Sequence, residues 1–139
     1  MILEHTLHIE APVERVWAAT VDVETWPDWT PTVTAVRKLS ADPLAPGSLV
    51  RLKQPLQRAA DWTVTELVPR ERFVWETRQP GLRIVAGHFL TEREGGIDNR
   101  LRVEMSGPVA ILFGWLITGL VRRALEQENS GLKRHCEKP

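Results

Sequence analysis

Cysteine, tyrosine and net charge are the scarce features of this chain. Its 139 residues include one cysteine, no tyrosine and three phenylalanines. Cys136 has no second cysteine to pair with, so an intrachain disulfide is excluded and a reducing, cytoplasmic setting is expected. Eighteen basic residues balance eighteen acidic residues. This balance gives no indication of a polyanionic partner, so nucleic-acid binding is not expected.

Long hydrophobic runs are missing as well. The longest, residues 109–121, has thirteen residues and includes Gly114 and Gly119, whereas a membrane-spanning helix needs about 20. We therefore expect a soluble helix here and no transmembrane segment. The N-terminal stretch MILEHTLHIEAP alternates and carries an acid. It does not have the basic start and long apolar core of a signal peptide.

The motifs of several common chemistries are absent. The sequence has no HExxH or CxxC pair for a metal, no GxSxG nucleophile, and no P-loop or GxGxxG loop for phosphates. His5 and His8 lie three residues apart on a predicted strand, so their side chains point to opposite faces and do not chelate together. No metal and no cofactor is therefore expected.

Tryptophan, by contrast, is abundant, with six residues in the chain. Two of them, Trp26 and Trp29, lie in the proline-containing stretch ETWPDWTP at residues 24–31. Because proline disfavours the helical conformation in the residue before it, this stretch is expected to form a short helical turn that leads into a strand. One tryptophan is expected to pack inward beside the terminal helix, and the other to cap a cavity near Trp115.

Hydrophobic periodicity predicts a series of strands between two helical regions. Residues 3–9 alternate like a strand with one buried face, and residues 13–21 change to helical spacing directly after Pro12, which suits a first helical turn. A long helix is predicted from residue 109 to about residue 135. Further strands are predicted at residues 32–39, 48–55, 60–67, 72–79, 82–92 and 100–106, with a hairpin turn at residues 95–99.

A sheet with one apolar face needs a cover, and the long terminal helix is the only predicted element large enough to supply it. We therefore expect an α+β chain in which residues 1–139 form a single domain. A gap between a curved sheet and one helix is a common position for a ligand.

This order of elements, and several local strings, resemble the START-like (SRPBCC) superfamily and its polyketide cyclase/dehydrase branch. The strings are PVERVWAATVDVETWPDWTPTVTAV, PLAPGSLVRLKQP, WTVTELVPRERFVWE and GLVRRALEQENSGLKRHCE. The resemblance implies a helix-grip fold, in which a curved antiparallel sheet of about seven strands wraps around a long C-terminal helix, with one or two short helices after the first strand. It supplies no invariant catalytic motif, so no catalytic residue is transferred from the family.

Three titratable side chains are candidates for acid–base chemistry in the cavity. His88 and His5 lie on the apolar faces of their strands, and Glu66 shares the parity of Trp62 and Val64, so all three are expected to point inward. Histidine titrates near neutral pH and is the usual proton carrier in such sites. The alternatives are a half-buried histidine bonded to backbone or water, and a solvated glutamate.

Large apolar side chains are the candidates for ligand binding, with ordinary core packing as the alternative. Tryptophan suits flat ring systems because it offers wide apolar area and one N–H group. A stripe at helical spacing on the terminal helix should face the sheet; its members are Phe113, Ile117, Val121, Ala124, Leu125 and Leu132. The ligand-binding candidates are Trp17, Trp26, Trp29, Trp62, Trp75, Phe113, Trp115 and Ile117.

Leu112, Trp115 and Leu116 form an apolar cluster on the side of the terminal helix that is charged further along. The alternatives for this cluster are packing beneath residues 26–29, a homodimer contact, and contact with a membrane or lipid at the cavity mouth.

Three functions are compatible with these features. The first is binding or transport of a hydrophobic small molecule such as a lipid, a polyketide or an aromatic metabolite. The second is a cyclase or dehydrase enzyme that uses a cavity histidine or carboxylate as acid and base. The third is a module that binds a protein partner through the cluster of Leu112, Trp115 and Leu116.

Overall fold

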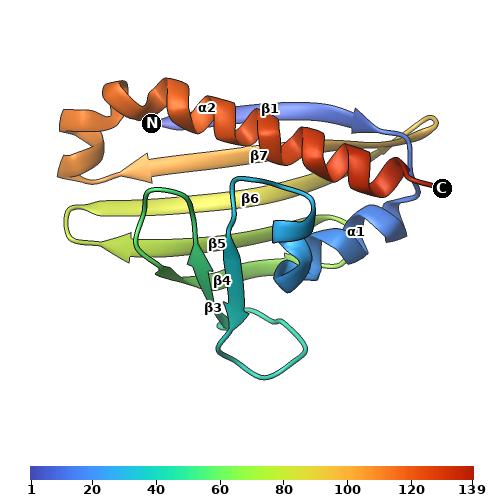
Figure 1. Cartoon of the computed structure of the whole chain (residues 1–139), viewed down its shortest axis with the longest axis horizontal. Coiled ribbons are helices and arrows are strands. Elements are labelled where there is room, and N and C mark those ends of the chain that lie inside the picture. The colour runs from blue at the N-terminus through green and yellow to red at the C-terminus, as the bar shows by residue number, and fades with distance from the viewer.

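The computed structural model describes residues 1–139, and its elements follow the predicted order (Figure 1). They are β1 (Ile2–Ile9), α1 (Val13–Val21), the 3-10 helix η1 (Val23–Asp28), β2 (Ala35–Lys38), β3 (Leu49–Lys53), β4 (Ala60–Val68), β5 (Arg72–Gln79), β6 (Leu82–Arg93), β7 (Gly96–Ser106) and α2 (Pro108–Glu137).

The seven strands form one antiparallel sheet in the order β1-β7-β6-β5-β4-β3-β2. The long helix α2 lies along β1 and β7, and α1 and η1 lie near its C-terminal end (Figure 1). This arrangement confirms the expected helix-grip fold. It also leaves the central strands β4, β5 and β6 facing the space beside α2 rather than lying directly under it.

Two element boundaries differ clearly from the sequence-based expectation, whereas the others agree closely. The second strand begins at Ala35 rather than at residue 32, because Thr30 and Thr32 hydrogen-bond to each other through their hydroxyl groups, 2.8 Å apart, and hold this part of the chain in a turn. The predicted hairpin is confirmed, but its turn consists of Glu94 and Gly95 alone. The last strand therefore starts at Gly96.

Both tryptophans of the stretch 24–31 are buried, and the short helical turn predicted there is η1. The indole N–H of Trp26 donates to the carbonyl oxygen of Thr20 at 3.1 Å. Trp29 stacks on His135 with ring centroids 6.4 Å apart. His135 lies 20 residues beyond Trp115, which is about 30 Å along a helix. The Trp26 ring centroid lies 5.6 Å from that of Trp29, and Trp26 is therefore also far from Trp115, so the expectation that one tryptophan caps the cavity near Trp115 is wrong.

Gly131 allows the chain after η1 to lie directly against α2. A Cβ atom at this position would lie 2.0 Å from the carbonyl oxygen of Trp29. Since only hydrogen fits into that space, glycine is required wherever α2 and the tryptophan segment pack this closely.

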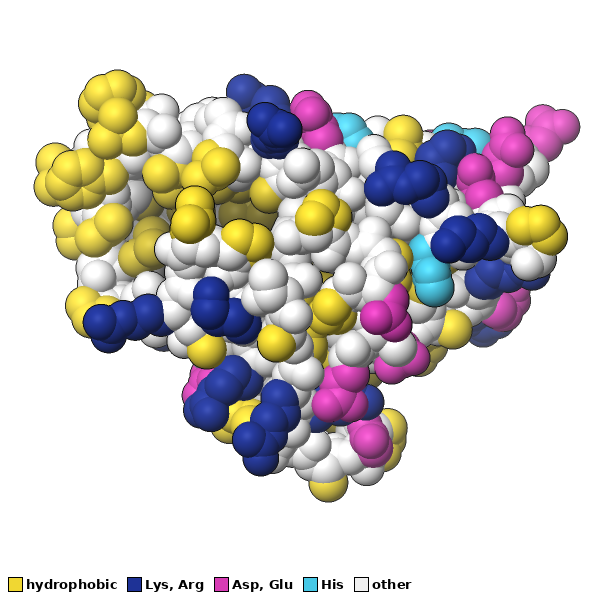
Figure 2. All heavy atoms as spheres, in the orientation of Figure 1, with side chains coloured by type: hydrophobic (Ala, Val, Ile, Leu, Met, Phe, Trp, Pro, Cys, Tyr) yellow, Lys and Arg dark blue, Asp and Glu magenta, His cyan; other side chains and the backbone are white.

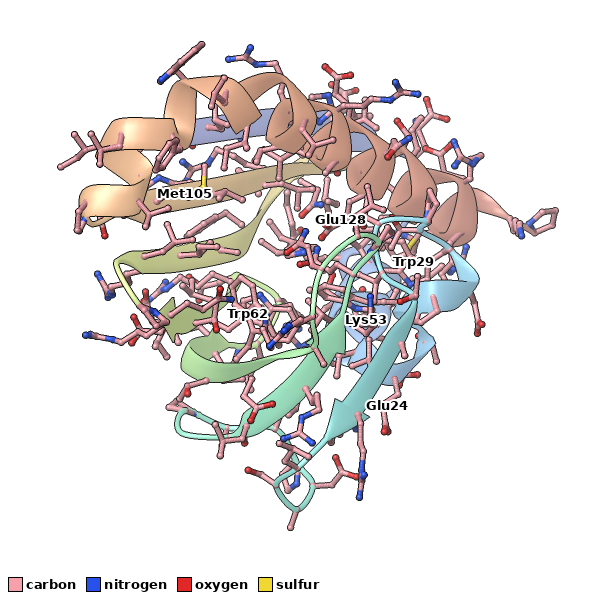
Figure 3. The ribbon with its side chains drawn as sticks, turned by 60° about the vertical axis from the view of Figure 1, so that its left-hand side comes forward. Glu24, Trp29, Lys53, Trp62, Met105 and Glu128 are labelled. Atoms are coloured by element: carbon pink, nitrogen blue, oxygen red, sulfur yellow. The ribbon has the colours of Figure 1, made fainter.

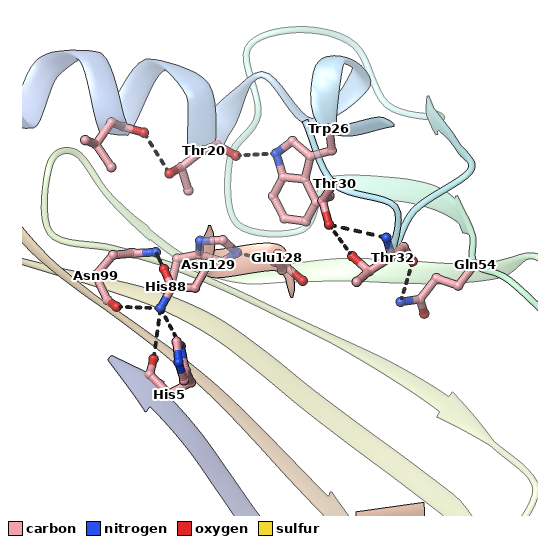
Figure 4. A network of polar contacts seen from close by, with 11 residues as sticks. His5, Thr20, Trp26, Thr30, Thr32, Gln54, His88, Asn99, Glu128 and Asn129 are labelled. Atoms are coloured by element: carbon pink, nitrogen blue, oxygen red, sulfur yellow. Dashed lines mark hydrogen bonds and ion pairs between the residues drawn. The ribbon is translucent and has the colours of Figure 1, made fainter. Parts of the chain in front are cut away.

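A buried amide pair fastens the middle of α2 to the sheet (Figure 4). The side-chain Oδ1 of Asn129 accepts a hydrogen bond from Asn99 Nδ2 at 2.9 Å. Asn129 Nδ2 donates to the carbonyl oxygens of Asn99 and His5, at 3.1 and 3.2 Å. Both asparagines are fully buried. These bonds satisfy Asn99 Nδ2 and both side-chain polar atoms of Asn129, which would otherwise be costly to remove from water, whereas Asn99 Oδ1 has no partner.

The first half of α2 is far more exposed than the sequence suggested. Phe113, expected to face the sheet, is 52% exposed, because the buried position at this end is taken by Gly114, with Met1 beside it. Leu112, Trp115 and Leu116 are also exposed, so the first of the three alternatives for this cluster, packing beneath residues 26–29, is wrong. By length and composition α2 could cross a membrane, and only 11% of its apolar 18-residue stretch is buried.

The single thiol gives a first testable prediction. Burial raises the pKa of Cys136 to about 11, so the folded protein holds the thiol proton more tightly than the unfolded chain does. The contribution of Cys136 to stability is therefore complete below about pH 9 and is lost as the pH rises toward 11. We expect iodoacetamide to react slowly with the native protein and readily with the urea-unfolded protein.

The Cys136→Ala variant is the control, because it has no thiol to titrate and should lose this part of the pH dependence of unfolding. Equal alkylation rates in the native and unfolded states would contradict the prediction.

Candidate functional site: a cavity between the sheet and the terminal helix

A cavity of about 610 Å³ lies between the sheet and α2. Its lining comprises 28 residues, of which 17 are hydrophobic, from the strands β3 to β7, from η1 and the chain after it, from the β3–β4 loop and from α2. The volume falls within the range of about 300–1,000 Å³ that is typical of small-molecule sites. The space-filling view shows a hollow bordered by hydrophobic side chains beside the first half of α2 (Figure 2).

The alternation of side chains along β6 and β7 determines which of their residues line the cavity. Ile84, Ala86 and His88 line it from β6, because every second side chain of a strand points to the same face. Leu101, Val103 and Met105 line it from β7 and pair in register with those three residues. The two strands thus supply a wall that is apolar except for one histidine.

A helical stripe supplies the opposite wall. Ile117, Val121, Ala124 and Glu128 follow one another at spacings of four and three residues and all line the cavity. The first three are apolar. The fourth is an acid, and it projects from α2 into the space between helix and sheet (Figure 3).

Three tryptophans form an aromatic wall inside the cavity. Trp26 and Trp75 have ring centroids 5.2 Å apart, and Trp62 lies 5.5 Å from Trp75. The His88 ring adjoins this wall, with its centroid 5.2 Å from that of Trp26. Such tilted ring pairs pack well and present broad flat surfaces to a neighbour.

His88 and Glu128 bring a buried polar pair to the cavity (Figure 4). His88 is 4% exposed, and its Nε2 lies 2.9 Å from Glu128 Oε1. When the carboxylate accepts from Nε2–H, the other ring nitrogen, Nδ1, is left as an acceptor. Nδ1 has no hydrogen-bond partner in the protein, and neither does the indole N–H of Trp62. Two residues of the cavity lining therefore each carry one buried polar atom without a partner.

The predicted site residues fall into two groups. Those that line the cavity are His88, Trp26, Trp62, Trp75 and Ile117. Those that do not are His5, Glu66, Trp17, Trp29, Phe113 and Trp115. The assignment of any of these residues to catalysis or ligand binding stays a prediction.

The inward position expected for Glu66 is wrong. The pairing of β4 with β5 shifts at a β-bulge, so that Val64 pairs with Trp75 and Glu66 with Val74. A bulge inserts one residue into the alternation and turns the following side chain to the other face. Glu66 is therefore exposed, and its Oε1 accepts a hydrogen bond from Arg72 Nε at 2.9 Å.

His5 faces inward, as expected, but toward α2 rather than the cavity. Its Nδ1 lies 3.0 Å from Asn129 Nδ2, within the network that fastens the helix. Trp17 packs against the hydrophobic core at its edge. No three His, Cys, Asp or Glu side chains lie close enough together to hold a metal ion.

Glu128 was not among the predicted site residues, although the sequence contains a signal for it. The apolar stripe of the terminal helix has a gap between Leu125 and Leu132, and residue 128 falls within it. An acid on the sheet-facing side of an amphipathic helix requires a partner. The inward-facing histidines of the strands are the candidate partners for such an acid, and His88 is the one that contacts Glu128.

The chain is similar to one known family over nearly its whole length. Residues 2–137 match the model of the family described as polyketide cyclase/dehydrase and lipid transport. No curated protein sequence matches the chain significantly.

Solved structures with the same fold include the di-domain ARO/CYC StfQ from the steffimycin biosynthetic pathway, with 10% identity and a TM-score of 0.81 over 98% of this chain. The chain spans 50% of the length of that protein. A Chromobacterium violaceum protein has 20% identity and a TM-score of 0.74, with 100% and 99% of the two chains covered. A START superfamily protein from Mycobacterium smegmatis has 18% identity and a TM-score of 0.76, with 98% and 97% covered.

At such identities these structures show a shared fold, which does not by itself fix a function. The family match, however, extends over residues 2–137. The chain therefore belongs to the polyketide cyclase/dehydrase and lipid transport family.

Proposed function

We propose that this protein binds a hydrophobic small molecule of the lipid, polyketide or aromatic class in the cavity between the sheet and α2. The observation that carries the proposal is a cavity of about 610 Å³ with a tryptophan wall, whose lining residues His88 and Trp62 each have a buried polar atom without a partner. Buried polar groups are nearly always hydrogen-bonded in folded proteins. A bound molecule would supply the missing partners.

The free polar atoms narrow the chemistry of this molecule. Nδ1 of His88 accepts a hydrogen bond when Glu128 holds the proton on Nε2, so it suits a hydroxyl group. The indole N–H of Trp62 donates, so it suits a carbonyl or ether oxygen. Trp26 and Trp75 offer apolar ring faces between these two points. A flat apolar body with a hydroxyl group and an acceptor oxygen fits this arrangement best.

Binding and its polar anchor are testable with two matched aromatic probes. We expect 2-naphthol to quench the tryptophan fluorescence at lower concentration than 2-methoxynaphthalene, which cannot donate a hydrogen bond to His88. One such bond contributes about 0.5–1.5 kcal/mol, or up to about tenfold in affinity. The His88→Leu variant should lose this preference. His8→Leu should keep it, because His8 lies outside the cavity and contacts Asp98.

Native mass spectrometry of gently purified protein adds an independent readout, since a retained apolar compound would appear as a mass shift. Absence of any such compound, together with no quenching by either probe, would overturn the binding proposal. Unchanged probe preference in His88→Leu would overturn only the role of the histidine.

The His88–Glu128 pair also favours a second function, that of a cyclase or dehydrase. With a β-hydroxy carbonyl compound, Nδ1 would take a proton from the carbon next to the carbonyl and return it to the departing hydroxyl, which leaves as water. Glu128 would stabilise the histidine while it carries this proton. A positioned general base contributes about 10²–10⁴-fold. His88→Leu should then lower turnover by that factor while changing affinity by no more than about tenfold.

A further inference from the structure

The exposed large hydrophobic side chains of this protein gather at one end. Seven of the twelve lie in the first half of α2, and we call these seven the α2 apolar patch. Its members are Val109, Ile111, Leu112, Phe113, Trp115, Leu116 and Leu120, with exposed fractions from 37% to 80%. Met1 and Ile2, at the start of β1, are exposed as well, and Met1 lies against Gly114 at the same end.

Clustering on this scale is unusual for a face that meets only water. Figure 2 shows the patch as a continuous group of hydrophobic side chains at one end of the molecule, beside the hollow. The same side of α2 becomes charged further along, where Glu126, Lys133 and Arg134 are located. The change from apolar to charged within one helix indicates that its two halves meet different surroundings.

Positive charge borders the α2 apolar patch. From Ser106 to Leu125 the chain has no acidic residue, and Arg122 and Arg123 follow the patch without forming an ion pair. The β5–β6 turn adds Arg78 and Arg83 beside it, since Gly81 of that turn accepts a hydrogen bond from the backbone N–H of Val109 at 2.9 Å.

Two of these four arginines are paired, because Glu76 contacts Arg83 at 2.6 Å and Arg78 at 3.9 Å. Arg122 and Arg123 form no ion pair, so the positive charge beside the patch is only partly compensated. A surface that combines apolar side chains with uncompensated cations complements a bilayer with anionic headgroups.

The patch leads directly into the cavity. Leu120 belongs to the patch and also lines the cavity, together with its neighbours Ile117 and Val121. On the β3–β4 loop Leu56 lines the cavity too and is fully exposed, with a φ of 62° that a leucine rarely adopts. Apolar side chains from two separate elements therefore border the mouth.

We infer that the α2 apolar patch docks on the surface of an anionic lipid bilayer and holds the mouth of the cavity against it. Trp115 suits the boundary between headgroups and acyl chains, because its indole N–H already donates to the Leu112 carbonyl at 3.1 Å and loses no partner on leaving water. A symmetric dimer through the same patch would gather the arginines of both copies around one contact, with no acid in the patch to pair with them. The inference does not depend on which molecule the cavity holds.

Vesicle flotation tests this surface. The wild-type protein is expected to float with vesicles of phosphatidylcholine and phosphatidylserine, and far less with phosphatidylcholine alone or at high salt. The double variant Leu112→Ser/Trp115→Ser should lower partitioning onto anionic vesicles by about tenfold or more, since it removes the largest apolar area. Arg122→Gln/Arg123→Gln should lower it by about tenfold.

The double variant Leu39→Ser/Leu49→Ser is the matched control, because these exposed leucines lie outside the patch and should leave flotation unchanged. Circular dichroism and sedimentation velocity of each variant check folding and association. The inference would be overturned if flotation were the same with anionic and neutral vesicles and the same for the patch variants and the wild type. A wild-type dimer that Trp115→Ser converts to a monomer without any vesicle binding would also overturn it.

Discussion

Replacing Gly131 by alanine is expected to lower the free energy of unfolding by about 3 kcal/mol, or the melting temperature by about 10 °C. The added methyl group would lie 2.0 Å from the carbonyl oxygen of Trp29. The obstacle is backbone, so it cannot move aside by changing a rotamer. Either α2 or the segment after η1 must shift, and each carries packing contacts, including the stack of Trp29 on His135. Urea unfolding followed by circular dichroism measures the loss.

The same helix contains a matched control. No neighbouring atom lies within 4 Å of the position that a methyl group on residue 119 would take, so Gly119→Ala adds that group to open space. The variant should be as stable as the wild type or more stable by up to about 1 kcal/mol, because alanine favours helix over glycine. A Gly131→Ala variant with the stability of Gly119→Ala would show that the close approach at Trp29 is not required.

Filling the cavity is expected to have the largest effect on binding. Ala86→Trp places the largest side chain on the inward face of β6, beside Trp75 and Val103. Affinity for 2-naphthol should fall by at least about 100-fold, which corresponds to about 2.7 kcal/mol. The fold should survive, because the added rings enter an existing cavity instead of a packed core. Binding is best measured by the fluorescence of 2-naphthol that stays with the protein after gel filtration, because this signal is separate from the fluorescence of the added tryptophan.

The neighbouring substitution Val85→Trp adds the same side chain to the opposite face of β6, where Val85 pairs with Glu76 and Glu104. It should leave affinity unchanged. If both variants bind 2-naphthol like the wild type, the probe binds elsewhere. Vesicle flotation of Ala86→Trp should stay normal, because the α2 apolar patch is untouched; the two proposals are thereby tested separately.

The fold was predictable because its signals are local. Alternation along regular strands, and glycines or prolines between them, identified every strand of the sheet. The same alternation placed His88, Trp62 and Trp75 on the inward face correctly. The position of the long helix followed from its length, because no other predicted element is large enough to cover the apolar face of the sheet; the family resemblance implied the same arrangement.

The predictions failed for residues whose orientation depends on contacts with distant parts of the chain rather than on strand or helix periodicity. Glu66 has the parity of an inward residue, but the bulge after Val64 reverses that parity and leaves no mark in the composition of the strand. Phe113 continues the apolar stripe of α2 toward an end where Gly114 and Met1 make the inward contact. Glu128 was missed because its partner, His88, is 40 residues away in the sequence.

The Asn129 network has a mechanical consequence. Its hydrogen bonds to Asn99 and His5 hold α2 at one point, and beyond that point Leu132 and Cys136 are fully buried. Before it, the helix is held by the Glu128–His88 pair and, at its first turn, by the hydrogen bond from the Val109 N–H to the Gly81 carbonyl oxygen. Between these two points the helix contacts the rest of the protein mainly through apolar side chains, and a Cβ atom on residue 119 would meet open space. The helix is thus supported at two points with a span between them. A shift of this span would widen the cavity mouth without breaking the hydrogen bonds of the Asn129 network.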